Sequence, residues 1–205
     1  MYSSREYDYS FYVSFAGSTK VGKTSLCNRI TKTTPFRWND KYDPTIGADS
    51  WCKYENIDEK KIRVYFYDTS GQERFKPVIR PYLSTRVDAI FLVYDLTDRK
   101  SFEDVRGWSN LIRENIEKNI SIILVGNKCD MEAERQVSYE EGRDLAEDLE
   151  MKFIETSAKT TEGVMHAFKL LLREKMQQVE GTSPSNILHL KSKIDPTDKT
   201  SSKCA

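Results

Sequence analysis

The chain has 205 residues, with 32 Lys and Arg residues against 32 Asp and Glu residues, so its formal net charge is zero. This length predicts one domain with a sizeable core and a tail, and the balanced charge does not favour a nucleic-acid partner. No stretch has the apolar length of a signal segment or membrane span, and four irregularly spaced cysteines with two histidines predict neither a disulfide framework nor a zinc site. We therefore expect a cytosolic protein.

Apolar strands and amphipathic helices are expected to alternate along the chain. The second and third strands are separated only by a short polar turn, which predicts an antiparallel hairpin. The alternation elsewhere predicts an α/β fold, in which a six-stranded and mostly parallel sheet with one antiparallel hairpin strand carries helices on both faces. The expected strands cover residues 11–16, 49–57, 61–68, 87–94, 121–125 and 152–156.

Apolar residues at helical spacing predict the helices that cover this sheet. One stripe predicts a helix in which Trp108 belongs to the core rather than to a ligand site. Ser138 and Glu141 have the spacing of a capping box that opens a further helix. His166, in the last helix, is expected at the surface. The stripe consists of Phe102, Val105, Trp108, Ile112 and Ile116, and the last helix is marked by Val164, Ala167, Phe168 and Leu171.

A glycine-bounded loop between the first strand and the first helix predicts a phosphate-binding site. The loop and helix start read Gly17-Ser18-Thr19-Lys20-Val21-Gly22-Lys23-Thr24, and Leu26 and Ile30 continue at helical spacing. Successive N–H groups at a helix start form an anion site, with Lys23 reaching the terminal phosphates and the Thr24 hydroxyl taking a Mg²⁺ position. An ordinary glycine turn before a helix is the alternative.

Two further motifs predict that the base is guanine. Asn127-Lys128-Cys129-Asp130 follows an apolar strand, at the strand end where ligands bind in open α/β sheets. A carboxylate can accept from both N1–H and the 2-amino group of guanine, whereas adenine offers neither donor, and such a site rejects the wrong base strongly. A polar turn would explain this motif alone. The Ser157-Ala158-Lys159 motif after another short strand makes the guanine interpretation stronger.

With Asp68-Thr69-Ser70-Gly71-Gln72, these motifs make the chain resemble a small GTPase of the Ras superfamily, and the Rab family within it. The resemblance covers roughly residues 10–178 and includes Thr45; residues 69–76 and 94–102 resemble the Rab family specifically. It implies a P-loop small G domain at 10–178, after a flexible N-terminus at 1–9, that binds and hydrolyses GTP with Mg²⁺ as a GTP/GDP switch in vesicle trafficking.

The resemblance also implies roles for individual residues. Thr24, Thr45 and Asp68 would hold Mg²⁺, directly or through water, while Thr45 and Gly71 would sense the γ-phosphate and Gln72 would orient the attacking water. The implied nucleotide-binding residues are Gly17, Thr19, Lys20, Val21, Gly22, Lys23, Thr24, Ser25, Phe36, Thr45, Gly71, Asn127, Lys128, Asp130, Ser157, Ala158 and Lys159.

Several positions depart from the family pattern. Lys20 stands where glycine is usual, and Thr19 is bulkier than its common counterparts, so both could affect nucleotide exchange and hydrolysis. A long first switch leaves either Phe36 or Trp38 to stack on guanine. The hydrophobic triad of Rab proteins becomes Ser50, Tyr67 and Tyr82, and the identities of effectors, exchange factor and GTPase-activating protein do not follow from it.

From residue 179 to 205 the composition predicts a flexible tail, in which Cys204 is a candidate lipidation site. An escort protein or GDI would handle the lipidated form, which would lie peripherally on the cytosolic face of an intracellular membrane. One alternative is a nucleotide-locked GTP-binding module with little hydrolysis, motivated by Thr19 and Lys20. A P-loop kinase or ATPase is a second alternative, but it leaves the guanine motifs without a purpose.

Overall fold

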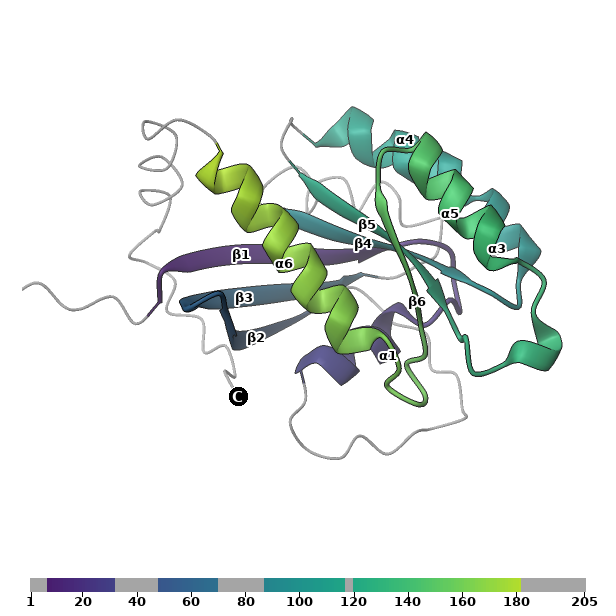
Figure 1. The fold of residues 1–205 in the computed structure, drawn as a ribbon, viewed down its shortest axis with the longest axis horizontal. Helices are drawn as coiled ribbons and strands as arrows, with labels where there is room; N and C mark the ends of the chain where they lie inside the picture. The colour runs from purple at the N-terminus through teal and green to yellow at the C-terminus, as the bar shows by residue number, and fades with distance from the viewer. Residues whose placement is uncertain (1–6, 32–47, 70–86, 117–119, 182–205) are drawn as a thin grey trace, which may run out of the picture.

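The computed structural model describes residues 7–31, 48–69, 87–116 and 120–181. They form a six-stranded sheet with strand order β2-β3-β1-β4-β5-β6, surrounded by helices (Figure 1). The strands are β1 Tyr9–Ala16, β2 Ala48–Ile57, β3 Lys60–Thr69, β4 Ala89–Asp95, β5 Ser121–Asn127 and β6 Lys152–Thr156. The helices are α1 Lys23–Thr31, α3 Arg99–Glu103, α4 Val105–Asn115, the 3₁₀ helix η2 Glu132–Glu134, α5 Tyr139–Asp148 and α6 Val164–Glu180.

The predicted sheet organisation is confirmed. All pairs are parallel except β2–β3, which is antiparallel from Ala48 opposite Thr69 to Ile57 opposite Lys60. Asp58 and Glu59 form the turn of this hairpin with φ angles of 47° and 64°. A two-residue turn with positive φ at both positions matches the twist of the strands it joins.

The sheet separates two hydrophobic cores, because successive strand residues point to opposite faces. On β4, Phe91 and Val93 belong to the core beneath α1 and α6, whereas Ile90 and Leu92 belong to the core beneath α4 and α5. All seven residues of β4 are buried, as a central strand covered on both faces requires. The predicted helical cover on both faces is thus confirmed.

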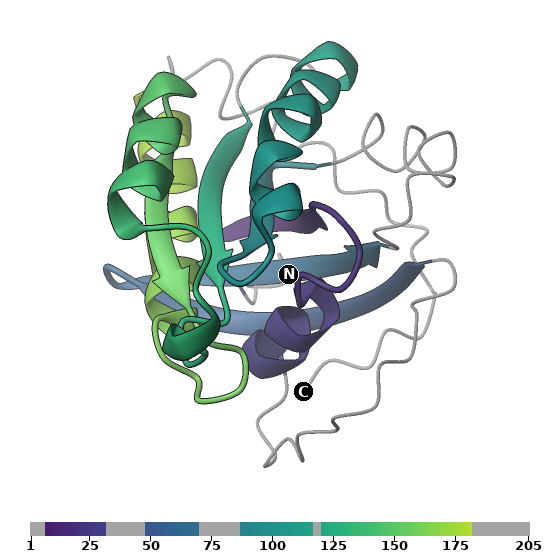
Figure 2. The ribbon, with the colours of Figure 1, turned by 90° about the vertical axis from the view of Figure 1, so that its right-hand side faces the viewer.

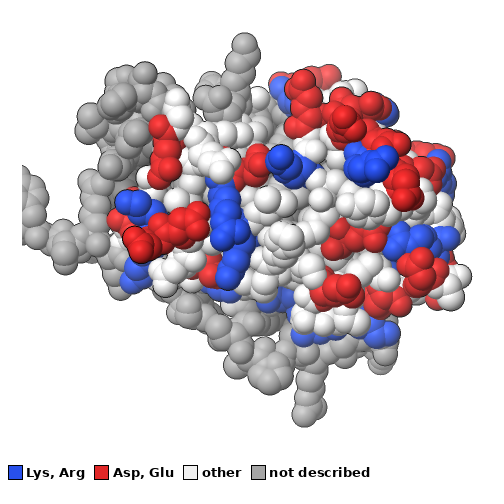
Figure 3. Space-filling view, viewed as in Figure 1, with Lys and Arg blue, Asp and Glu red and all other residues white. Residues whose placement is uncertain are grey.

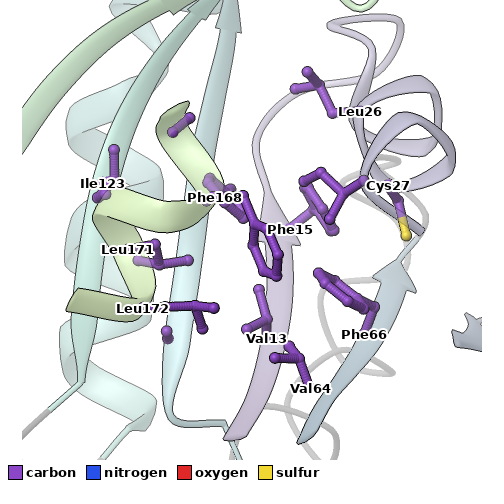
Figure 4. Packing of buried hydrophobic residues seen from close by; sticks show 14 of the residues in the cluster. Val13, Phe15, Leu26, Cys27, Val64, Phe66, Ile123, Phe168, Leu171 and Leu172 are labelled. Atoms are coloured by element: carbon purple, nitrogen blue, oxygen red, sulfur yellow. The ribbon is translucent and has the colours of Figure 1, made fainter. Parts of the chain in front are cut away.

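Aromatic residues fill the core between the sheet and α6. The ring centroids of Phe66 and Phe168 lie 5.5 Å apart, and those of Phe15 and Phe91 lie 5.1 Å apart. Figure 4 shows Phe15, Phe66 and Phe168 close together between the strands and α6, with Leu171 and Leu172 extending the same core. This packing holds α6 against strands β1 and β3 of the sheet.

The helix predicted from the stripe of residues 102–116 occurs as two segments, α3 and α4. Asp104 lies between them with φ −70° and ψ −14°, so the backbone remains right-handed helical through the junction. Aspartate is a poor residue for a helix interior because its side chain competes for hydrogen bonds. Trp108 is 5% exposed, which confirms its prediction as a core residue, while Ile116 follows the last helical residue with extended dihedral angles.

Three smaller predictions about the helices can be compared with the structure. The capping box is present, because Ser138 accepts from the N–H of Glu141 and the Glu141 carboxylate accepts from the N–H of Ser138. His166 is exposed, as predicted. Helix α6 continues to Glu180 and Val179 is 4% exposed within the core, so ordered structure extends two residues past the boundary expected at 178.

Candidate functional site

The loop from Gly17 to Gly22 joins β1 to α1 and has the geometry of an anion nest. Gly17, Lys20 and Gly22 all have positive φ, at 130°, 64° and 99°. A Cβ on Gly17 would lie 2.0 Å from the carbonyl oxygen of Val93, so this turn requires glycine. The loop ends at the N-terminus of α1, where free N–H groups and the helix dipole favour phosphate.

Lys23 is the first residue of α1 and its ammonium group is held by this loop. The Nζ atom donates to the carbonyl oxygens of Gly17 at 2.9 Å and Ser18 at 2.7 Å, and the residue is 6% exposed. A cation of fixed position beside several N–H groups fits a polyphosphate chain. Thr24, the next residue, is exposed at the start of the helix, as a hydroxyl ligand for Mg²⁺ requires.

The Asn127 side chain connects this loop to the base motifs. Its Nδ2 donates to the carbonyl of Val21 at 2.8 Å, and its Oδ1 accepts from the Thr156 hydroxyl at 3.1 Å and the N–H of Ala158 at 3.2 Å. A Cβ on Gly22 would lie 2.3 Å from the same Nδ2. These contacts indicate that Asn127 positions the phosphate loop and the base loop relative to each other.

Asp130 and Ser157 form a hydrogen-bonded pair at the predicted base site. The Ser157 hydroxyl donates to Oδ1 of Asp130 at 2.6 Å. The same oxygen of Ser157 accepts from the N–H groups of Lys159 and Thr160, so its single proton is committed to Asp130. The carboxylate is thereby oriented, and we expect its second oxygen to face the base.

Asp95 also belongs to this site. In the sequence it stood out only as part of residues 94–102, which resemble the Rab family. Asp95 is 5% exposed, and its carboxylate pairs with Nζ of Lys128 at 2.5 Å through Oδ2, while Oδ1 accepts from the N–H and hydroxyl of Thr97. Lys128 has a φ of 71°. Buried charges are tolerated when they are paired and hydrogen-bonded, so Asp95 fixes the Lys128 side chain beside the base loop.

Arg29 is a second residue that the sequence analysis missed. It lies on α1 and donates through Nε to the carbonyl of Ala158 at 2.7 Å and through a terminal nitrogen to that of Lys159 at 2.9 Å. Figure 2 shows α1 beside the loop that follows β6. The sequence indicates this role of Arg29 only weakly, since an arginine on a surface helix ordinarily has many possible partners.

The structure places the remaining predicted residues as follows. Thr19 and Ser25 are half-buried and Lys20 and Lys159 are exposed. Asp68 pairs with Asp49 in the β2–β3 ladder, which gives its backbone position only. The predictions for Phe36, Trp38, Thr45, Gly71, Gln72 and Cys204 fall outside the residues that the structure describes.

Cys27 in α1 and Cys129 in the base loop are both free cysteines. Cys27 lies on the buried face of α1, whereas Cys129 is half-buried. Desolvation raises the pKa of Cys129 to about 11, so this residue is a neutral thiol at pH 7. Cys129 therefore adds no negative charge beside the Asp130 carboxylate at this pH.

The donor set also fits magnesium bound together with a nucleotide. Among residues 7–31, 48–69, 87–116 and 120–181, there is no group of three or more His, Cys, Asp or Glu side chains that could hold a metal alone. Mg²⁺ commonly takes one or two protein oxygens, several waters and the substrate phosphates. The Thr24 hydroxyl, next to Lys23 at the phosphate loop, suits this mode of binding.

The fold and these loops define a P-loop nucleotide-binding domain. The family model described as "Ras family" matches residues 13–177. The chain is 39% identical over 179 residues to "GTP-binding protein ypt2" of Schizosaccharomyces pombe, covering 87% of this chain and 88% of that protein. It is 38% identical to "Ras-related protein Rab-13" and 37% identical to "Ras-related protein Rab-8A", both of Rattus norvegicus, with at least 96% of each chain covered.

The chain belongs to the Ras family and is a Rab-like small GTPase. It binds GTP and GDP with Mg²⁺, hydrolyses GTP and takes part in vesicle trafficking with the regulators and effectors of that class. The nucleotide-locked module is not favoured.

None of the described helices combines the length and the apolar character needed to cross a bilayer. Acidic and basic side chains are interspersed on the face that Figure 3 shows.

The conformation of Lys20 leads to a prediction about nucleotide release. A φ of 64° costs an L-residue about 1–2 kcal/mol, whereas glycine adopts it freely. We expect Lys20→Gly to raise the free energy of unfolding by about 1 kcal/mol and to slow GDP release, because a relaxed loop holds its N–H groups in place. Denaturant unfolding and release of a fluorescent GDP analogue measure the two effects.

Lys20→Ala is the matched control, because it removes the charge and keeps the strained backbone. If the charge of Lys20 dominates instead, both variants should release GDP faster and with a weaker dependence on salt. Faster release from Lys20→Gly would therefore contradict the strain argument.

Proposed function

We propose that this Rab-like switch holds its nucleotide between two loops that the Asn127 amide joins. Lys23 and the N–H groups of the loop from Gly17 to Gly22 bind the β- and γ-phosphates, and Thr24 supplies a hydroxyl to Mg²⁺. Asp130, oriented by Ser157, accepts from the N1–H and 2-amino groups of guanine. The observation that carries this assignment is the Asn127 side chain, which bonds Val21 of one loop and Ala158 of the other.

We further propose that hydrolysis depends on residues of the two switch segments. Thr45 and Asp68 complete the Mg²⁺ site with Thr24, and Gly71 donates its N–H to the γ-phosphate, so the switches hold one conformation only in the GTP form. Gln72 orients the attacking water, and a GTPase-activating protein accelerates the reaction by stabilising the transition-state charge. Either Phe36 or Trp38 stacks on the guanine.

Gln72→Leu tests the hydrolysis assignment. The change should lower single-turnover GTP hydrolysis by at least about tenfold while leaving GTP affinity within about twofold, because it removes water positioning and no binding contact. Asn115→Leu, a change on α4 away from the loops, is the control for a general effect of a new leucine. A parent protein as slow as the Gln72 variant would contradict this role and favour the nucleotide-locked alternative.

The C-terminal tail, residues 179–205 with the first two still in helix α6, is proposed to attach the GTP form to an intracellular membrane through a lipid on Cys204. The tail contains four lysines and three acidic residues, so it lacks the strong basic charge that normally supports a single lipid. One chain alone gives marginal and reversible attachment. An exchange factor, effectors and a GDI or escort protein would then govern a protein that moves readily between cytosol and membrane.

Cys204→Ser should make the protein wholly soluble in cell fractionation, whereas the parent should divide between cytosol and membrane. Ser202→Ala is the matched control, since it changes a nearby residue of the tail and keeps Cys204. Its distribution should equal that of the parent. Stable membrane association of the Cys204 variant would show that another feature anchors the protein.

A further inference from the structure

The Ser18 side chain links the phosphate loop to helix α4. Its hydroxyl donates to Oδ2 of Asp104 at 3.1 Å and accepts from Nε1 of Trp108 at 3.3 Å. Ser18 is 8% exposed and Trp108 is 5% exposed, so both groups meet away from bulk water. Burial strengthens such bonds and makes the loss of a partner costly.

The main chain of the same residue holds the lysine of the loop. The carbonyl oxygen of Ser18 accepts from Nζ of Lys23 at 2.7 Å, the shorter of the two bonds between this ammonium and loop carbonyls. Ser18 is thus bonded on one side to α4 and on the other side to Lys23. The direction of its carbonyl, and so the position of the ammonium, depends on where its side chain is held.

Asp104 and Trp108 restrain the Ser18 hydroxyl in complementary ways. A hydroxyl has one proton to donate, and Asp104 receives it; the indole N–H can only donate, and it binds an oxygen lone pair of Ser18. The other oxygen of Asp104 pairs with Lys100 at 3.2 Å, but Lys100 is largely exposed and its ion pair is of the weak surface kind. The contact of Asp104 with Ser18 is part-buried, and the bond from the Trp108 N–H to Ser18 is buried.

We propose that Asp104 and Trp108 are positioning residues for Lys23, acting through Ser18 to set how tightly the loop holds the β-phosphate. The inference rests on the proposed function in one respect, namely that Lys23 binds the nucleotide phosphates. It assigns to α4 a part in nucleotide affinity that is separate from its packing role. It also gives the indole N–H of Trp108 a role in nucleotide affinity that is separate from the packing of the indole ring in the core.

The test compares the affinities of the full-length protein for GDP and GMP, because only GDP carries the phosphate that Lys23 would contact. Ser18→Ala should weaken GDP about tenfold, the effect of losing a buried hydrogen bond, and leave GMP within about twofold. Trp108→Phe keeps most of the ring in the core and removes the N–H, and it should weaken GDP selectively by a smaller factor. Lys100→Ala, which removes the exposed partner of Asp104, should change neither affinity.

Equal weakening of GDP and GMP by Ser18→Ala and Trp108→Phe would overturn the proposal, since it would show a general structural effect. Unchanged GDP affinity in both folded variants would also overturn it. Circular dichroism establishes that each variant is folded, and Trp108→Phe remains informative if Ser18→Ala unfolds.

Lys23→Met separates this inference from the proposed function. If Lys23 binds phosphate, its replacement weakens GDP far more than GMP, and adding Ser18→Ala to that variant should cause little further loss. A Lys23→Met protein with unchanged GDP affinity would refute the assignment of Lys23 itself. A selective loss from Lys23→Met, with a full and additive further loss from Ser18→Ala, would refute the coupling alone.

Discussion

Asp130→Asn is expected to exchange guanine for xanthine as the preferred base. GDP affinity should fall by on the order of 10³-fold, because the N1–H and 2-amino donors of guanine would meet an amide N–H and remain unpaired. Xanthine presents an oxygen in place of the 2-amino group, and the same amide can donate to it. Competition between GDP and xanthosine diphosphate measures the change.

The structure gives a reason for the direction of this amide. Ser157 must donate its proton to position 130, because its oxygen already accepts from the N–H groups of Lys159 and Thr160. In the variant, the amide oxygen would therefore turn to Ser157 and the amide nitrogen would turn to the base. A carboxylate has no such asymmetry, so the orienting effect of Ser157 becomes visible only in the variant.

The double variant Ser157→Ala, Asp130→Asn tests whether the Ser157 hydroxyl sets the orientation of the amide at position 130. Without the hydroxyl the amide can rotate, and discrimination between the two bases should decrease. Equal affinity of the parent protein for ATP and GTP would contradict the assignment of Asp130 to base recognition. A double variant as selective for xanthine as the single one would show that Ser157 does not orient the side chain.

Gly17→Ala is expected to destabilise the protein by about 3 kcal/mol or more, because it adds both a steric clash and backbone strain. The new Cβ would lie 2.0 Å from a main-chain oxygen of β4, and the φ of 130° suits only glycine. Neither β1 nor β4 can move away easily, since they pair directly and both lie within the sheet. For a domain of this size the melting temperature should fall by about 6–12 °C.

Gly107→Ala is the matched control for this change. Gly107 lies within α4, and a Cβ there would have no atom within 4 Å. Alanine in a helix interior is favoured over glycine by about 0.5–1 kcal/mol, so this variant should be slightly more stable than the parent. Thermal unfolding measures the melting temperatures of both variants and of the parent. An unchanged melting temperature for Gly17→Ala would show that the turn can relax.

Much of the fold was predictable because its signals are local. The β2–β3 hairpin follows from two strand patterns separated by a short polar turn, and the Ser138 capping box follows from a spacing of three residues. The division of residues 102–116 into α3 and α4 was missed. There the apolar stripe continues through Asp104, and the partner that explains this residue lies 86 positions away, at Ser18.

The sequence by itself determined the class of site, because each loop motif carries its chemistry in contiguous residues that lie where a strand ends. Only the tertiary structure revealed Arg29, Asp95 and the contact between Ser18 and α4. Asp95 reaches Lys128 because the parallel register of β4 and β5 places it opposite Asn127, and Arg29 meets a loop about 130 residues further along the chain. Such contacts depend on strand order and helix placement, which many distant side chains decide together, and no short stretch of the chain encodes them.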